Sequence, residues 1–197
     1  MFEEKHIFEN AIFSENITTI ILDINEGVKS IDLSNYLALI SKGNLNAKSI
    51  DFNFENETIS LTAEEVLYLS TTNAKTLSLE RVNGDNKDVL VKVSLLDKEG
   101  HPIDVLGLAV SVAFKALSEL NHIKLFNGEN QIPFTTNKNN LVAMLKVNTS
   151  YTISYFYTVS FDKYMSFGSF YVNGKEIRSG ESIELKSGSS LDVDIVL

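Results

Sequence analysis

The chain of 197 residues contains no cysteine, no tryptophan and only three histidines. The absence of cysteine excludes disulfide scaffolds, thiolate zinc sites and cysteine nucleophiles. His6, His101 and His122 are far apart in the sequence, so no two of them have the spacing of metal ligands on one element. We therefore expect no metal site and no cofactor.

The chain also lacks an excess of basic residues and a long apolar segment. Its 17 Lys and Arg against 26 Asp and Glu give a net charge of −9, whereas nucleic-acid-binding proteins need a basic surface. The longest uncharged run, Val147 to Phe161, alternates polar and apolar residues and is shorter than the about 20 apolar residues of a membrane helix. The acidic start, with Glu3 and Glu4, is unlike a signal peptide. We expect no nucleic-acid partner, no membrane insertion, and a location in the cytoplasm or in a larger particle.

No arrangement of polar residues predicts catalysis. Asp97, Glu99 and Asp104 surround Gly100, and clustered oxygen ligands can bind calcium, but Asp and Gly are also the usual residues of a β-turn. Spacing singles out no pair of carboxylates, no serine lies in a nucleophile elbow, and no glycine-rich phosphate loop is present. The sequence predicts no catalytic residue.

The polar segment from Val82 to Lys87 predicts a division of the chain, because its Asn-Gly and Gly-Asp pairs are turn signals between two apolar stretches. Residues 1–86 contain 6 basic and 14 acidic residues, net −8, whereas residues 87–197 contain 11 and 12, net −1. We predict a small acidic α+β domain over 1–86 and a β-sandwich domain over 87–197. The acidity of the first part fits either a solvated surface or a face that docks onto a basic partner.

A weak repeat runs through the first part. The segment Asn46–Phe52 recurs 27 residues later as Asn73–Leu79, and Val28–Leu33 is similar to both. A leucine-rich repeat is one interpretation, but such repeats need three or more full copies to bury a core. A compact α+β domain with two weak helix-strand repeats is therefore the better prediction.

Helix caps precede each full copy of this repeat. Thr62 and Glu65 have the spacing of a capping box and predict a helix that begins after Thr62, and Ser34 is a weaker N-cap. We predict two helix-then-strand units after an opening strand at Ile17 to Ile24. Leu37 to Ile40 fits a strand as well as a helix.

From Lys87 onward the apolar residues recur at every second position, which indicates strands. The alternation over Leu106 to Phe114 favours a strand, with a helix from Asp104 to Leu120 as the rival. Many short strands separated by turns are typical of a sandwich or barrel. Besides Val89 to Leu96, the predicted strands are 122–126, 131–134, 141–147, 151–161, 167–172, 182–185 and 191–197.

Several of these segments resemble a known family, that of carboxypeptidase-regulatory-like and related bacterial Ig-like domains. The resemblance covers residues 88–197, and it departs from the family at Asn139-Asn140, where glycine is usual, and over Leu106–Gln131. It implies an Ig-like or prealbumin-like β-sandwich that acts as a structural or adhesive module without catalysis. The segments that carry it are Val91–Ile103, similar to the family's first hairpin, Thr135–Ile153, similar to its central strands, and Val172–Leu185, similar to its final hairpins.

Nine of the nineteen aromatic residues lie between Tyr151 and Tyr171. In the strand 151–161 the aromatic and apolar side chains share one face and the Thr and Ser side chains share the other, which predicts a core face with a polar reverse. Phe156 is the exception, since it lies on the polar face, and it predicts a subunit contact or a ligand platform. Together with two asparagine turns it forms the candidate interaction surface, which consists of Phe156, Asn127, Asn130, Asn137 and Asn140.

A mostly β chain without catalytic residues predicts a protein that works by presenting surfaces. We expect a non-enzymatic structural component of a large assembly, a homo-oligomer whose partners are its own copies and other assembly proteins. Fifteen Lys against two Arg is the composition of an AT-rich genome, and a bacteriophage virion protein of the tail, neck or capsid surface is the leading instance. The alternative is a receptor- or glycan-binding adhesion module, and a small enzyme or inhibitor is a third reading.

Overall fold

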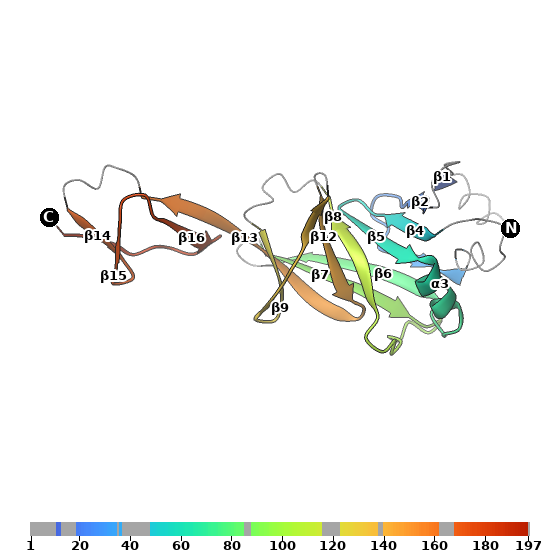
Figure 1. Cartoon of the computed structure of the whole chain (residues 1–197). Helices are drawn as coiled ribbons and strands as arrows, with labels where there is room; N and C mark the ends of the chain where they lie inside the picture. Colours follow the sequence, from blue (N-terminus) through green and yellow to red (C-terminus); the bar gives the residue numbers. More distant parts are fainter. Residues whose placement is uncertain are drawn as a thin grey trace.

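The structure is a computed structural model that describes residues 11–12, 19–34, 36, 48–84, 88–115, 123–137, 140–161 and 168–196. Strands dominate these residues, and α3 (Ala63–Ser70) is the one complete helix among them. Two sheets form a layered body, and a narrow arm extends from it at the end opposite α3 (Figure 1). The mostly β fold predicted from the sequence is confirmed.

The first sheet has seven strands in the order β1-β2-β4-β5-β8-β12-β11. Neighbouring strands are antiparallel except β2 and β4, which are parallel. Its strands are β1 (Ala11–Ile12), β2 (Thr19–Asp23), β4 (Ser49–Asn53), β5 (Glu57–Thr62), β8 (Ala109–Phe114), β11 (Thr135–Asn137) and β12 (Asn140–Lys146).

The second sheet follows the order β10-β9-β13-β7-β6-β3, and all of its pairs are antiparallel. Its strands are β3 (Ser30–Asp32), β6 (Thr76–Asn83), β7 (Val89–Leu96), β9 (Ile123–Asn127), β10 (Asn130–Ile132) and β13 (Thr149–Ser160). The distal part of β13 pairs with β16 (Ser182–Lys186), and a third sheet of order β15-β14-β17 completes the arm. That sheet consists of β14 (Ser169–Val172), β15 (Lys175–Ile177) and β17 (Val193–Val196).

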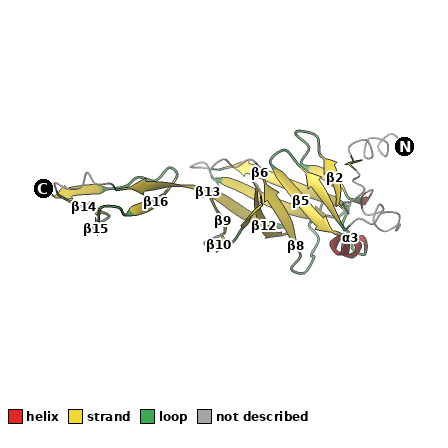
Figure 2. Cartoon of the chain, turned by 45° about the horizontal axis from the view of Figure 1, so that its top comes forward, coloured by secondary structure: helices red, strands yellow, loops and turns green. Residues whose placement is uncertain are grey.

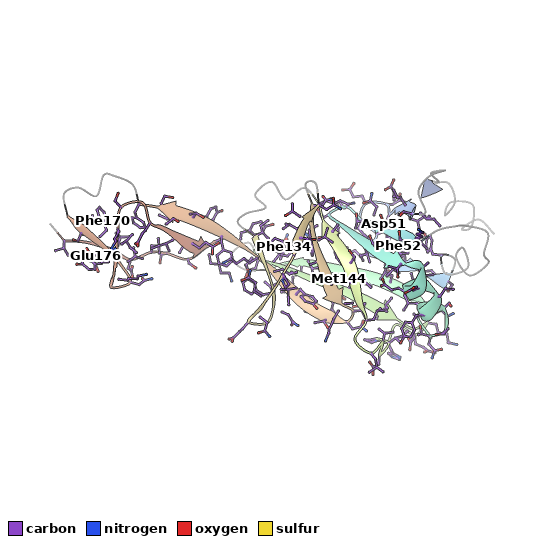
Figure 3. The ribbon with its side chains drawn as sticks, viewed as in Figure 1. Asp51, Phe52, Phe134, Met144, Phe170 and Glu176 are labelled. Atoms are coloured by element: carbon purple, nitrogen blue, oxygen red, sulfur yellow. The ribbon has the colours of Figure 1, made fainter. Side chains whose placement is uncertain are left out.

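The inward side chains of the first two sheets form a single core, as alternation predicts for two packed layers. Phe52 and Leu145 of the first sheet and Leu77 and Leu95 of the second are all less than 2% exposed. Phe134 packs against this core where the chain passes from β10 in one sheet to β11 in the other (Figure 3). The body, comprising the strands up to β12 and residues 149–155 of β13, is therefore sandwich-like (Figure 2).

Both sheets cross the boundary predicted at residues 86 and 87. β6 and β7 pair over eight residues across it, and β5 pairs with β8 in the other sheet. The Asn83-Gly84 pair lies in the hairpin between β6 and β7, where the Gly84 N–H donates to the Asp88 carbonyl at 2.7 Å. Turn residues occur at hairpins as readily as at domain boundaries, so the turn signal alone did not identify a boundary. The sheets therefore correct the two-part division, since strands from both halves build one core.

The capping box is confirmed. The Thr62 hydroxyl accepts from the Glu65 N–H at 3.1 Å, and the Glu65 carboxylate accepts from the Thr62 N–H at 3.3 Å. The strands that end the two weak repeats, β4 and β6, lie in different sheets, so the copies do not stack as neighbours. In the first unit Ser34 and Tyr36 are helical, and the Leu37 to Ile40 segment lies outside the described residues.

The period-two pattern located most strands of the second half correctly. β8 confirms a strand rather than a helix over 109–114, whereas residues 116–120 of the rival helix lie outside the described part. Five strands were not predicted. β1 and β3 in the first half have only two and three residues, and β5, β11 and β15 were missed for two other reasons. β11 and β15 are short and mostly polar, and the alternation in β5 lies directly before the predicted helix cap.

Candidate interaction surface

The core-facing side of β13 continues beyond the body. Tyr151 and Ile153 are only 3% and 2% exposed between the two sheets. Tyr157 shares their face by alternation, yet it is 44% exposed. The pairing of β13 with β7 and β9 ends by Tyr155, and from Phe156 onward its described pairing is with β16 alone. β13 therefore leaves the two-layered body and becomes part of the arm (Figure 1).

The first part of the arm is a two-stranded ribbon of β13 and β16. Tyr157 is opposite Leu185 and Val159 is opposite Ile183, and directly opposed residues share a face. One face of the ribbon is therefore apolar. The other face carries Phe156, Thr158, Ser160, Ser182, Glu184 and Lys186.

The second part of the arm is the sheet β15-β14-β17, which also has one apolar face. Val193 and Ile195 at its β17 edge are 42% and 58% exposed, whereas Val172 and Ile177 are buried. The apolar face is thus open along β17. Register places on it Phe170 between Ile177 and Ile195, and Val172 between Lys175 and Val193. The opposite face carries Tyr171, Glu176, Asp194 and Val196. Figure 3 labels Phe170 and Glu176 in this part of the arm.

A ring contact joins the two apolar faces. The Phe161 and Phe170 centroids are 6.5 Å apart. Phe161 extends the ribbon, because its N–H donates to the Glu181 carbonyl and its carbonyl accepts from the Gly180 N–H. It therefore has the same orientation as Tyr157. We call the combined surface the arm face, and it consists of Tyr157, Val159, Phe161, Phe170, Val172, Ile177, Ile183, Leu185, Val193 and Ile195.

Phe156 lies at the joint between body and arm. Its ring centroid is 6.4 Å from that of Phe126, and the Lys124 Nζ lies 4.5 Å above it, a cation–π geometry. Lys124 also forms an ion pair with Glu184 of β16. Beside it, Lys186 pairs with Asp88 at 3.0 Å. Phe156 is half-buried, so its position on the polar face is explained by contacts within the chain.

The asparagines of the candidate surface lie at two separate turns. Asn127 and Asn130 close the β9–β10 hairpin, and Asn137 and Asn140 close the β11–β12 hairpin. The first turn belongs to the second sheet and the second turn to the first sheet. Sequence proximity of the two turns therefore does not place them on one sheet, and a joint surface of the five residues stays a prediction.

Sequence reasoning missed a polar cluster between the sheets. Glu57 of β5 is 2% exposed and pairs with Arg81 of β6, and the nearby Lys115 donates to the Phe54 carbonyl. Burial raises the pKa of Glu57 above its ordinary value, outweighing the opposite effect of Arg81, and burial lowers the pKa of Lys115. The ion pair connects the two sheets. No spacing in the sequence could have revealed it, since the partners meet only in space.

A cavity of about 280 Å³ adjoins this cluster. Asn25, Lys29, Asn56 and Asn83 line it together with Arg81. Its described lining contains no serine, histidine or cysteine, and its buried carboxylate is engaged by a guanidinium. The arrangement therefore offers polar contacts but no nucleophile with an adjacent base.

The turn after β7 brings Asp97, Glu99 and His101 together, with possible ligand atoms within 4.8 Å of one another. Asp97 Oδ1 accepts from the N–H groups of Glu99 and His101 at 2.9 Å each, and Gly100 has a φ of 83°. These contacts are those of a turn closed by an aspartate. Asp104, which the sequence analysis grouped with Asp97 and Glu99, does not belong to this cluster of possible ligands.

Comparison of the chain with family models, with curated proteins and with solved structures gives no match. The resemblance to Ig-like domains therefore stays a prediction. Within the described residues, no helix is long and apolar enough to cross a membrane. The class that the fold defines is a β-rich, sandwich-like protein with a projecting arm.

Proposed function

We propose that the protein is a non-enzymatic structural subunit that works through protein–protein contacts in a larger assembly. The arm face carries this proposal. It is an apolar surface on a single layer of strands, and no second layer covers its β17 side among the described residues. An isolated ribbon of two strands is marginally stable in water, and contiguous exposed apolar surface marks contact sites.

The other features of the molecule support the same function. The arm projects from a body whose core is complete, so a partner can reach it without unfolding the body. The buried Glu57–Arg81 pair has a structural position between sheets, and the Asp97 cluster is a turn. Neither supplies a group poised for acid–base or nucleophilic chemistry.

A bacteriophage virion protein of the tail, neck or capsid surface remains the instance we propose, with other copies and other virion proteins as partners. This step rests on the composition and on fold analogy. The protein would be made in the host cytoplasm and carried in the particle.

The adhesion-module alternative has less support. It needs Phe156 and the two asparagine turns to act on one ligand, but Lys124 lies over the Phe156 ring and the two turns belong to different sheets. A glycan platform would instead need several exposed aromatic rings lining one groove.

Light scattering on the purified chain over about a hundredfold range of concentration tests the proposal. We expect a defined oligomer, because a structural subunit forms stable contacts. A chain that is strictly monomeric at the highest concentration would contradict it.

A further inference from the structure

We infer that the Asn127-Gly128 and Asn173-Gly174 turns are sites of spontaneous deamidation, whereas the third Asn-Gly pair of the chain, Asn83-Gly84, is protected by its hairpin. Asparagine is a chemically labile residue, and a following glycine hinders attack on its side chain least because glycine has no Cβ. The modification needs no partner protein, so it is independent of the proposed assembly contacts.

Deamidation of an Asn-Gly pair requires only the chain and water. The glycine backbone nitrogen loses its proton to hydroxide and attacks the side-chain Cγ of the asparagine, and ammonia leaves as a succinimide ring forms. Water then opens the ring at either carbonyl and yields aspartate or isoaspartate. Overall, the amide and one water become a carboxyl group and ammonia. The reaction therefore needs a glycine N–H that can lose its proton and a backbone that can rotate this nitrogen toward Cγ.

The first argument is the hydrogen bonding of the glycine N–H groups. Gly84 donates its N–H to the Asp88 carbonyl at 2.7 Å, and this bond must break before the nitrogen can be deprotonated. Among the described residues, no group accepts from the N–H of Gly128 or of Gly174. The attacking nitrogen is therefore available in two of the three pairs and engaged in the third.

The second argument is the length of the hairpin that contains each pair. β6 and β7 pair over eight residues, and Asn83 is held in the last of these pairs, opposite Val89. The β9–β10 and β14–β15 hairpins, which contain Asn127 and Asn173, pair over only three residues each. Short hairpins with few contacts open locally at a lower free energy than long ones. The rotation that closes the ring is therefore easier in these two turns.

The third argument is the freedom of the side chain that is attacked. Asn127 and Asn173 are exposed, and no described group forms a hydrogen bond with either side chain. Asn148 shares a positive φ with Asn173, 61° against 51°, but it is not followed by glycine. Its side chain also accepts from the Leu95 N–H at 3.1 Å and donates to the Ile103 carbonyl at 2.8 Å. A left-handed asparagine is therefore not sufficient to define a site.

The modification changes both charge and backbone length. Each conversion adds one negative charge to a chain whose net charge is already −9. Isoaspartate also adds a carbon atom to the backbone path. At Asn173 this atom is inserted into the two-residue turn between Val172 and Lys175, which pair with each other. The longer turn no longer matches the register of β14 and β15, so the end of the arm is altered.

Peptide mapping of the wild-type chain tests the inference. Cleavage after Lys and Arg releases the three pairs in separate peptides, residues 82–87, 125–138 and 164–175. The chain is incubated at mildly alkaline pH in native buffer and, in parallel, in urea, and mass spectrometry follows isoaspartate at each asparagine. The ratio of the native rate to the urea rate removes the effect of neighbouring charges in the sequence, such as Glu129 and Lys175.

We expect this ratio to be lower for Asn83 than for Asn127 and Asn173 by about tenfold or more, the factor that one backbone hydrogen bond provides. Asn127→Gln is the matched control, because the longer side chain forms the corresponding ring much more slowly. Isoaspartate should disappear at position 127 in this variant and persist at Asn173.

The possible outcomes are distinct. A ratio for Asn83 that equals or exceeds that of the other two pairs would overturn the protection by the hairpin. Absence of isoaspartate at Asn127 or Asn173 in the native sample, with isoaspartate present in urea, would exclude that turn as a site. The oligomeric state of the chain is measured separately by light scattering, so failure of this inference and failure of the proposed function are distinguishable.

Discussion

The two halves of β13 alternate polar and apolar side chains in the same way but lie in different surroundings. In the body, residues 149–155 are flanked by β7 and β9 and are covered by the first sheet. In the arm, residues 156–160 are flanked by β16 alone, and Tyr157 is 44% exposed. Alternation therefore specifies an apolar face, whereas coverage of that face depends on a second layer.

The body and the arm also differ in how many buried side chains stabilise them. The body buries side chains from both sheets in one core and closes it with the Glu57–Arg81 pair. The described arm has three buried residues, Val172, Ile177 and Ser187. The arm is therefore expected to have a lower local stability than the body.

The largest difference is expected between a core and an arm phenylalanine. Phe52→Ala in β4 removes a side chain that is 0% exposed and should lower the free energy of unfolding by about 3–5 kcal/mol. Phe170→Ala in β14 removes a half-buried ring and should leave the main urea transition of the body almost unchanged. Urea unfolding followed by circular dichroism measures both. Equal losses would show that arm and body unfold as one unit.

The second difference concerns the two arginines of the chain. Arg81→Ala leaves the buried Glu57 carboxylate without its partner and should cost about 3 kcal/mol, since an uncompensated buried charge is strongly destabilising. Arg178→Ala, at an exposed position of the arm, should change stability by less than about 0.5 kcal/mol. If Arg81→Ala lowered the free energy of unfolding no more than Arg178→Ala does, the ion pair would not connect the sheets as described.

The smallest effect is a pH dependence confined to the body. Burial raises the pKa of Glu57 above its ordinary value of 4.5, so the folded chain holds this proton where the unfolded chain has lost it. The resulting stabilisation is fully present below pH 4.5 and is lost as the pH rises through the folded pKa. The difference in unfolding free energy between wild type and Glu57→Gln should therefore fall from about pH 4 to pH 8. Parallel curves for the two proteins would contradict this cause.

Local signals in the sequence predicted local structure well. Thr62 and Glu65 predicted the start of α3, and alternation predicted β7, β8 and β12. Asn-Gly is a typical turn pair, and Asn173-Gly174 closes the β14–β15 hairpin with φ angles of 51° and 79°, the left-handed pair that a two-residue hairpin requires. These features depend on residues within one or two turns of each other, so the sequence contains their causes.

The candidate surface was predicted less well, for a physical reason. Phe156 is unusual for its face, but the contacts that explain it come from Phe126 and Lys124, which are about 30 positions away in the sequence. The length of β13 was the one available signal of the arm. β13 has 12 residues and its neighbour β7 has eight, so part of β13 extends beyond the end of β7.

By itself, the sequence determined most of the strands, which side of each of these is apolar, several of the turns, and that the whole is acidic and free of thiols. Those properties follow from side-chain chemistry and from the period of two along an extended backbone. Only the tertiary structure decided that strands from both halves share one core, that Glu57 meets Arg81, and that the apolar side of β13 is covered at one end and open at the other. Each of these depends on where a distant segment lies, and no local pattern carries that information.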